Sequence, residues 1–186
     1  MTTVFVSGSR KLGRLNPRVR ERVDNIVRQG FSILVGDANG ADKALQTYLY
    51  GLGYPDVTVY CAGDECRNNV GEWRTVYVSV PSGVRGRKFY SAKDKAMAEI
   101  AEIAFVLWDG ASAGALENIL EMLRRKKKAV VYFSPRQAFA TVATPSDLRA
   151  LLSECGPENL AAIDSKIGLR RHLRELEGET QPQLGL

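Results

Sequence analysis

The sequence predicts an α/β fold with a mostly parallel sheet of five or more strands and a helical C-terminal extension. Apolar, β-branched runs alternate with segments of helical periodicity between residues 3 and 133. Turns containing glycine join several of these runs to the segments that follow. Such alternation is typical of a parallel sheet with right-handed crossovers and helices on both faces. The chain has 186 residues, enough for one domain of this class with a sizeable core.

The first two strands and the helix between them have clear boundaries. Residues 3–7 are β-branched and apolar, and they predict a strand. Asn16 and Pro17 are typical of an N-cap followed by proline at the first helical position. Apolar residues then recur at helical spacing as far as Gly30, which ends the helix. Residues 31–35 predict the second strand.

The remaining elements of this part follow from the same two periodicities. The strand expected at residues 103–108 is apolar on both sides, as a buried parallel strand should be. Residues 62–87 are irregular, with a short strand or helical turn around residues 73–80. A long irregular segment in a compact domain is often functional. We expect strands over residues 57–61, 103–108 and 129–133, and helices over residues 41–52, 91–102 and 112–127.

The part after residue 134 differs in character from the alternating part before it. We expect residues 1–134 to form the α/β domain and residues 135–176 to form a helical extension packed on it. Two helices are predicted there, over residues 146–155, capped by Ser146 and Asp147, and over residues 158–176. Residues 177–186 are polar and contain glycine and proline, so we expect a disordered tail.

Composition narrows the class of protein. Hydrophobic residues make up 45% and charged residues 25%, as in ordinary globular proteins. No apolar run approaches the roughly 20 residues that span a bilayer, and the first residues lack a signal-peptide pattern. We therefore expect a cytoplasmic protein without a membrane partner. The cysteines, Cys61, Cys66 and Cys155, fit neither a disulfide framework nor a zinc site, so we expect free thiols and no metal.

The net charge of +5 is partly concentrated in the basic run at residues 124–128. A basic run can bind nucleic acid. It also suits a helix C-terminus, where cations complement the dipole and the last carbonyl groups. Because no aromatic residues interleave with the run, we favour a solvated helix end.

Two glycine turns carry the main functional prediction, because each follows an apolar strand and opens a helix. They span residues 36–42 and 110–118. Such turns let the backbone approach a ligand and aim unpaired N–H groups at it, and the helix dipole favours a phosphate. Both turns fall at the carboxyl edge of the sheet, where such folds bind ligands. The residues expected to meet the ligand here are Gly36, Gly40, Ala41, Gly110, Ser112 and Gly114.

A third turn, with Gly8, Ser9 and Arg10, ends the first strand. Its small residues can line a phosphate, and Arg10 can pair with it in a bidentate manner. A plain strand-to-helix turn with an exposed arginine is the alternative.

Acidic and aromatic residues near these turns have two interpretations each. Asp42 is a candidate ligand-binding residue, but it also lies in the first turn of a helix, where it can simply cap that helix. Asp37 can bind a ribose hydroxyl or orient its loop, and we favour the orienting role because a carboxylate repels a phosphate. Tyr90 and Asp94 can hold a base or ribose together. Alternatively, Tyr90 packs at the core edge and Asp94 complements a helix start.

These motifs, from residues 7–10 to residues 130–132, together resemble the SLOG superfamily of nucleotide-binding proteins. The turn at residues 36–42 is similar to the glycine-rich turn of the DprA branch. Residues 93–98 and 101–107 resemble the corresponding run of LOG phosphoribohydrolases, which cleave a base from a nucleoside 5′-monophosphate. The turn at residues 110–118 takes the place of their PGGxGTxxE motif. The resemblance implies a Rossmann-like three-layer fold and a homo-oligomer. We also expect no cofactor.

The sequence departs from the LOG pattern at three positions. Lys93 stands where those enzymes carry arginine, and Ala115 replaces the threonine of the motif. Asn118 stands at the place of their catalytic glutamate, and the same holds for related deoxynucleoside phosphate hydrolases. An amide cannot act as a nucleophile or general base. The resemblance therefore implies a retained pocket with altered chemistry.

We accordingly expect a protein that binds a nucleotide or a nucleotide-derived ligand at the carboxyl edge of the sheet. Tyr90, Asp94, Trp108 and Asn118 are expected to serve the ribose and base. One alternative is a nucleoside monophosphate N-glycosidase in which Glu117, Asp94 or Asp37 supplies the carboxylate. The other is DprA-like binding of single-stranded nucleic acid.

Overall fold

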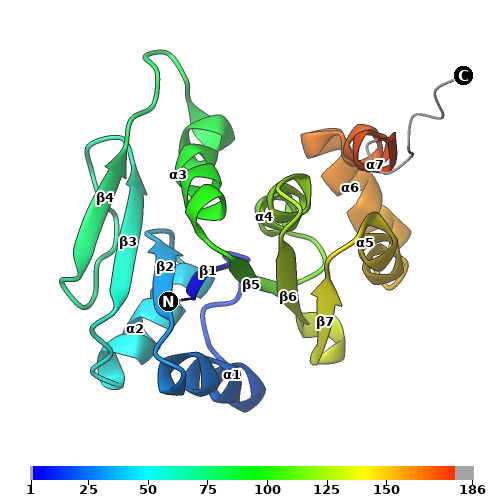
Figure 1. Ribbon diagram of the computed structural model, residues 1–186. Helices are drawn as coiled ribbons and strands as arrows, with labels where there is room; N and C mark the ends of the chain where they lie inside the picture. The colour runs from blue at the N-terminus through cyan, green and yellow to red at the C-terminus, as the bar shows by residue number, and fades with distance from the viewer. Residues whose placement is uncertain (1, 179–186) are drawn as a thin grey trace, which may run out of the picture.

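The computed structural model describes residues 2–178 and confirms the predicted α/β fold. Its strands form one sheet in the order β4-β3-β2-β1-β5-β6-β7, and all neighbours are parallel except β6 and β7. Helices cover both faces, as Figure 1 shows. The strands are β1 (Thr3–Gly8), β2 (Ser32–Gly36), β3 (Val57–Ala62), β4 (Arg74–Val78), β5 (Ile103–Trp108), β6 (Lys128–Phe133) and β7 (Ala138–Val142).

Alternating side chains of the central strands separate the core into two layers. Val4 and Val6 of β1 pack with the helices α1 (Pro17–Arg28) and α2 (Ala41–Gly51) on one face. Phe5 packs on the other face, which α3 (Gly86–Ile100) and α4 (Ala113–Arg124) cover. This period of two is what a strand buried on both faces requires.

The direction of chain progression reverses between β1 and β5. From β1 the chain runs outward through β2 and β3 to β4, and it then returns to place β5 on the other side of β1. Gly8 at the end of β1 is in register with Leu107 near the end of β5. In an open parallel sheet, this reversal leaves a crevice at the carboxyl ends of the two strands.

The C-terminal extension contributes to the same core as α4. It contains a short 3-10 helix (Ser134–Arg136) and β7, followed by α5 (Pro145–Leu152), α6 (Pro157–Ile167) and α7 (Leu169–Gly178). Buried leucine and isoleucine side chains of all three α-helices join the cluster on the α3–α4 face. Among residues 2–178, no helix is both long and apolar enough to cross a bilayer.

Several predicted boundaries are wrong, and local backbone chemistry explains them. Gly168 adopts a left-handed conformation with φ of 68°, which divides the single helix expected over residues 158–176 into α6 and α7. Thr144, not Ser146, caps α5 through a capping box with Asp147. Strand β7 was not predicted, and Gln137 at φ of 49° makes the turn that leads into it.

Two further boundary differences affect the segments around the site and the chain end. Helix α3 begins at Gly86, five residues before the helix expected over residues 91–102, so Tyr90 lies inside it. The tail expected over residues 177–186 lies outside the described residues from position 179 onward, and positions 177 and 178 belong to α7.

Candidate functional site

A cavity of about 630 Å³ lies at the crevice between the ends of β1 and β5. Its walls come from the β1–α1 loop, the first half of α3, the β5–α4 turn and one face of α6. Its volume falls in the usual range for small-molecule sites. The sequence-predicted residues that line it are Gly8, Arg10, Asp42, Tyr90, Asp94, Ser112, Gly114, Glu117 and Asn118.

The second glycine turn leaves two backbone amides open at this cavity. The Asp109 carboxylate accepts hydrogen bonds from the amides of Ala111 (3.1 Å) and Ser112 (2.8 Å). Ser112 caps α4 by accepting from the Ala115 amide at 3.3 Å. The amides of Ala113 and Gly114 donate to no atom within residues 2–178, and both residues line the cavity. The N-terminus of α4 therefore presents unused donors and the positive end of its dipole.

Ser9, Gly110 and Trp108 support this turn from behind. Ser9 is fully buried, and its hydroxyl donates to Asp109 Oδ1 at 2.9 Å. Gly110 has a φ of 74°, a left-handed conformation that favours glycine. Trp108 is also fully buried and donates from Nε1 to the Ser112 carbonyl at 3.0 Å. These three residues shape the turn and do not line the cavity.

Two amides of the first glycine turn, those of Ala38 and Ala41, are already occupied, contrary to the sequence-based expectation. The Ala41 amide donates to the Ser9 carbonyl at 3.3 Å, and the Ala38 amide donates to Asp42 Oδ2 at 3.1 Å. A Cβ on Gly40 would lie 2.2 Å from the Arg10 carbonyl oxygen. Glycine is therefore required because the β1–α1 loop crosses this turn closely. Gly36, Gly40 and Ala41 do not line the cavity.

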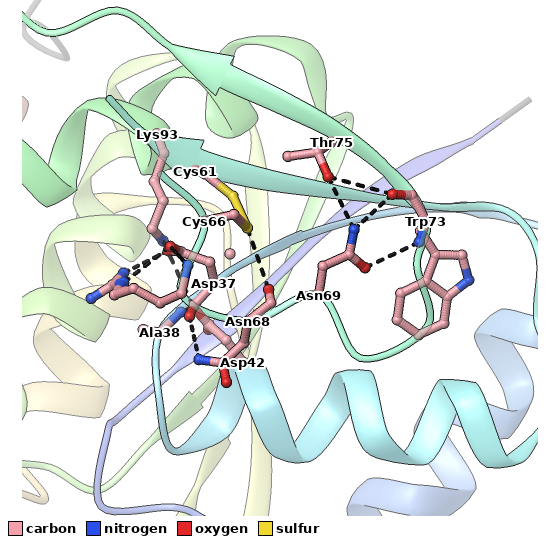
Figure 2. The surroundings of a disulfide bond; sticks show 12 residues. Asp37, Ala38, Asp42, Cys61, Cys66, Asn68, Asn69, Trp73, Thr75 and Lys93 are labelled. Atoms are coloured by element: carbon pink, nitrogen blue, oxygen red, sulfur yellow. Dashed lines mark hydrogen bonds and ion pairs between the residues drawn. A yellow bond between two sulfur atoms is a disulfide. The ribbon is translucent and has the colours of Figure 1, made fainter. Parts of the chain in front are cut away.

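Beneath the cavity, the buried ammonium group of Lys93 meets three carboxylates. Lys93 is 3% exposed, and its Nζ lies 2.8 Å from Asp94, 3.7 Å from Asp42 and 4.0 Å from Asp37. Figure 2 shows Lys93 reaching from α3 toward Asp37 and Asp42. Burial opposes the charging of Lys93, but the three carboxylates outweigh burial and hold its pKa above the usual value. This ion cluster ties α3 to the turn between β2 and α2.

The Asp37 carboxylate binds Arg67, and Asp37 does not itself line the cavity. Its carboxylate accepts from Arg67 Nε at 3.0 Å, from Arg67 Nη2 at 2.5 Å and from the Arg67 amide at 3.0 Å. The guanidinium group of Arg67 lies 4.3 Å from the ring centre of Tyr90, and both residues line the cavity. Sequence reasoning missed Arg67 because the only indication was its place in the irregular residues 62–87.

Cys61 and Cys66 form a disulfide, so the expectation of free thiols at both positions is wrong. Cys61 lies near the carboxyl end of β3, and the chain then turns back so that Cys66 lies beside it (Figure 2). Cys66 directly precedes Arg67, so the crosslink holds the segment that carries this cavity residue. Cys155 is free, and burial raises the pKa of its thiol to about 11.

The two candidate catalytic carboxylates line the cavity with cationic partners. Asp94 is bound to Lys93, and Glu117 pairs with Arg87 at 3.2 Å. Burial raises the pKa of Glu117, and the positive charge of Arg87 offsets part of this effect. Asn118 is buried, and its amide group donates to the Ser7 hydroxyl at 3.0 Å. Sequence reasoning missed Arg87 and Lys166 as cavity residues, because a basic residue on an exposed helix face carries no local signal.

The basic run at residues 124–128 serves structural contacts at the far end of α4. Arg124 and Arg125 both pair with Glu121. Lys127 donates to the carbonyl groups of Ala98 and Glu99 at the end of α3. These contacts agree with our interpretation of the run as a helix end.

Replacing Lys93 with methionine should destabilise the fold, because Asp37, Asp42 and Asp94 then lose a shared countercharge. Removing one member of a buried ion pair costs about 3–5 kcal/mol. Chemical denaturation should therefore show a loss of this size for Lys93→Met. The control is Lys95→Met on the exposed side of the same helix, with an expected change within about 0.5 kcal/mol. Equal stability of the two variants would contradict the proposed contribution of the ion cluster to the free energy of unfolding.

The same cluster predicts a pH dependence that is specific to Asp42. Burial, with opposition from Lys93, raises the pKa of Asp42 from 3.8 to about 6. The folded state then binds more protons than the unfolded state between these values, so the contribution of Asp42 to stability falls as pH rises. The free energy of unfolding of the wild type, relative to Asp42→Asn, should drop by on the order of 1–3 kcal/mol between about pH 4 and about pH 6. A difference that stays flat or rises would refute the assignment.

Comparisons with known proteins support the fold and nothing finer. No protein-family model matches the chain, and no curated protein matches its sequence. One similar solved structure is that of DNA processing protein A from Helicobacter pylori, described for its unique single-stranded DNA binding mode. The TM-score is 0.52 and the identity 15%, over 70% of this chain and 64% of that chain. This chain thus spans less than two thirds of that protein, with which it shares an α/β fold.

Proposed function

We propose that this protein binds a nucleoside phosphate, with the phosphate at the N-terminus of α4. The observation that carries the proposal is the pair of unused amides of Ala113 and Gly114, which face a cavity at the switch point of the sheet. Helix N-termini bind phosphate through such amides and through the helix dipole. Arg10 lines the same cavity and is exposed, so it can add a charge-assisted hydrogen bond.

The opposite wall of the cavity suits the nucleoside part of the ligand. Tyr90 is 36% exposed there and offers an aromatic surface. Asp94, on the same helix as Tyr90, accepts from hydroxyl groups. Asn118, further along α4 from the phosphate site, can donate to one group and accept from another. A phosphate at α4 and a ring near α3 would therefore occupy opposite sides of the same cavity.

The charge partners of the carboxylates favour binding over bond cleavage. Asp94 is held by Lys93, and Glu117 is held by Arg87. Asn118, at the position where the resembling hydrolases carry their glutamate, supplies no nucleophile. We therefore propose a binding protein, and its ligand should leave the site chemically unchanged.

Titration with a panel of nucleoside monophosphates and their parent nucleosides tests this proposal. The phosphorylated forms should bind at least about tenfold more tightly than the nucleosides, because the amides of α4 recognise the phosphate. Chromatography of the same mixtures after incubation should show no free base. Equal affinity for nucleoside and nucleotide would overturn phosphate recognition, and base release abolished by Glu117→Gln would establish the hydrolase alternative.

Substitution of Gly114 by alanine should weaken nucleotide binding without harming the fold. A Cβ there meets no atom within 4 Å, so the methyl group would occupy open space at the cavity wall. Affinity should fall at least about tenfold, while stability stays equal or rises by up to about 1 kcal/mol. Gly51→Ala is the matched control, since Gly51 also lies in a helix with no atom within 4 Å of its added Cβ. Unchanged binding by Gly114→Ala would place the phosphate elsewhere.

Binding of single-stranded DNA is a second candidate function, favoured by the structural likeness to DNA processing protein A. The test is fluorescence anisotropy with an oligothymidylate of about ten nucleotides. If DNA is the ligand, affinity should fall steeply between about 50 and about 200 mM salt. Gly114→Ala should then weaken binding of the oligonucleotide as it weakens binding of the mononucleotide. If binding of the oligonucleotide is lost only when the basic residues of the run at 124–128 are neutralised, the run is a non-specific basic patch.

A further inference from the structure

A second hollow of about 800 Å³ adjoins the cavity at the switch point. It runs between α3, α4 and the C-terminal helices, and we call it the α3–α7 groove. Its far end is lined by Arg124, Arg171, His172 and Glu175. The cavity and the groove share part of their lining, so they form one continuous depression. The shared residues are Arg87, Ser91, Asp94, Glu117, Asn118 and Lys166.

One face of α3 forms a wall of this groove along two helical turns. Lys88, Ser91, Ala92 and Lys95 all line it, and they are three, four and seven residues apart from the first. Residues at this spacing lie on the same side of a helix. The wall is therefore a polar stripe with a lysine near each end.

The carboxylates of the groove already have cationic partners. Glu121 pairs with Arg124 and Arg125. Glu175 lies 3.4 Å from Arg171 and 3.2 Å from His172. Together with the Arg87–Glu117 pair, these contacts neutralise the acidic side of the groove.

Three lysines of the groove have no such partner. The ammonium groups of Lys88, Lys95 and Lys166 make no ion pair within the described part of the chain. They come from two elements, α3 and α6, that face each other across the depression. The charge left over along the groove is therefore positive, which suits an anionic occupant.

Arg87 bridges the depression where the cavity meets the groove. Its guanidinium group donates to the Lys166 carbonyl at 2.6 Å and pairs with Glu117 at 3.2 Å. Its side chain is 42% exposed, so a ligand can reach it. A phosphate placed at this junction would compete with Glu117 for the same guanidinium donors.

We infer that the α3–α7 groove is the second half of the binding site, and that the ligand class is a dinucleotide. This inference rests on the proposed function. One nucleotide occupies the cavity with its phosphate at α4. The linking phosphate lies near Arg87 and Lys166, and the second nucleoside extends along α3 between Lys88 and Lys95. The C-terminal helices then serve as the outer wall of the site.

The experiment compares three probes of rising length by calorimetry. They are thymidine 5′-monophosphate, the 5′-phosphorylated thymidine dinucleotide and an oligothymidylate of about ten nucleotides, with the adenine series in parallel. The dinucleotide should bind at least about tenfold more tightly than the mononucleotide, because it gains contacts in the groove at little added entropic cost. The longer chain should bind no more tightly than the dinucleotide, since the two hollows end at α7.

A double variant, Lys88→Gln with Lys95→Gln, tests whether the gain arises in the groove. The ratio of dinucleotide to mononucleotide affinity should fall to about one. The matched control, Lys43→Gln with Lys128→Gln, removes the same charge from exposed lysines that line neither hollow, and it should keep the ratio.

Each of the remaining outcomes overturns a specific part of the proposal. Tight mononucleotide binding without a gain for the dinucleotide overturns the groove but leaves the proposed function intact. A gain that survives the double variant also overturns the groove. Affinity that keeps rising to the longest probe overturns the dinucleotide class in favour of single-stranded nucleic acid. Binding of none of the three probes, in either series, overturns both proposals.

Discussion

The buried ammonium group of Lys93 is the interaction on which the floor of the site depends. It joins α3 to the turn between β2 and α2, and through Asp37 it also stabilises the segment that carries Arg67. Three carboxylates face two cations in this cluster, so one negative charge is in excess. Asp42, whose pKa is raised by burial to about 6, is where a proton is most easily retained. Because Lys93 is fully engaged by carboxylates, the cations available to a ligand are those of the cavity walls.

The two glycine turns look alike in sequence but have different roles. In the turn at residues 36–42, close packing against Arg10 and hydrogen bonds to Ser9 and Asp42 use the backbone groups internally. In the turn at residues 110–118, the Asp109 carboxylate satisfies the first amides and leaves those of Ala113 and Gly114. The difference has two causes. In the second turn, Asp109 binds only the first amides. In the first turn, the β1–α1 loop crosses close to Gly40. We therefore place the proposed phosphate at the second turn, where the amides of Ala113 and Gly114 line the cavity.

Most strands and helices of the α/β part were predictable, because burial imposes periods of two and 3.6 residues on the sequence. Strand β4 and the first turn of α3 were not, because they lie in the irregular segment. The carboxyl-edge position of Gly8, Ser112 and Gly114 followed from the same reasoning. What could not be predicted depends on contacts between distant segments. The pairing of Asp37 with Arg67 and the approach of Cys66 to Cys61 need the return path of residues 62–70. Helices α6 and α7 contribute to the site only because the extension packs on α4. No local sequence pattern encodes that packing.

The most direct measurement is a two-dimensional amide NMR titration of the full chain with a nucleoside monophosphate. The amide protons of Ala113 and Gly114 should move downfield as they begin to donate to the phosphate. Those of Ala38 and Ala41 already donate within the protein and should stay in place. Saturable binding that leaves the Ala113 and Gly114 signals unmoved would contradict a phosphate site at the N-terminus of α4.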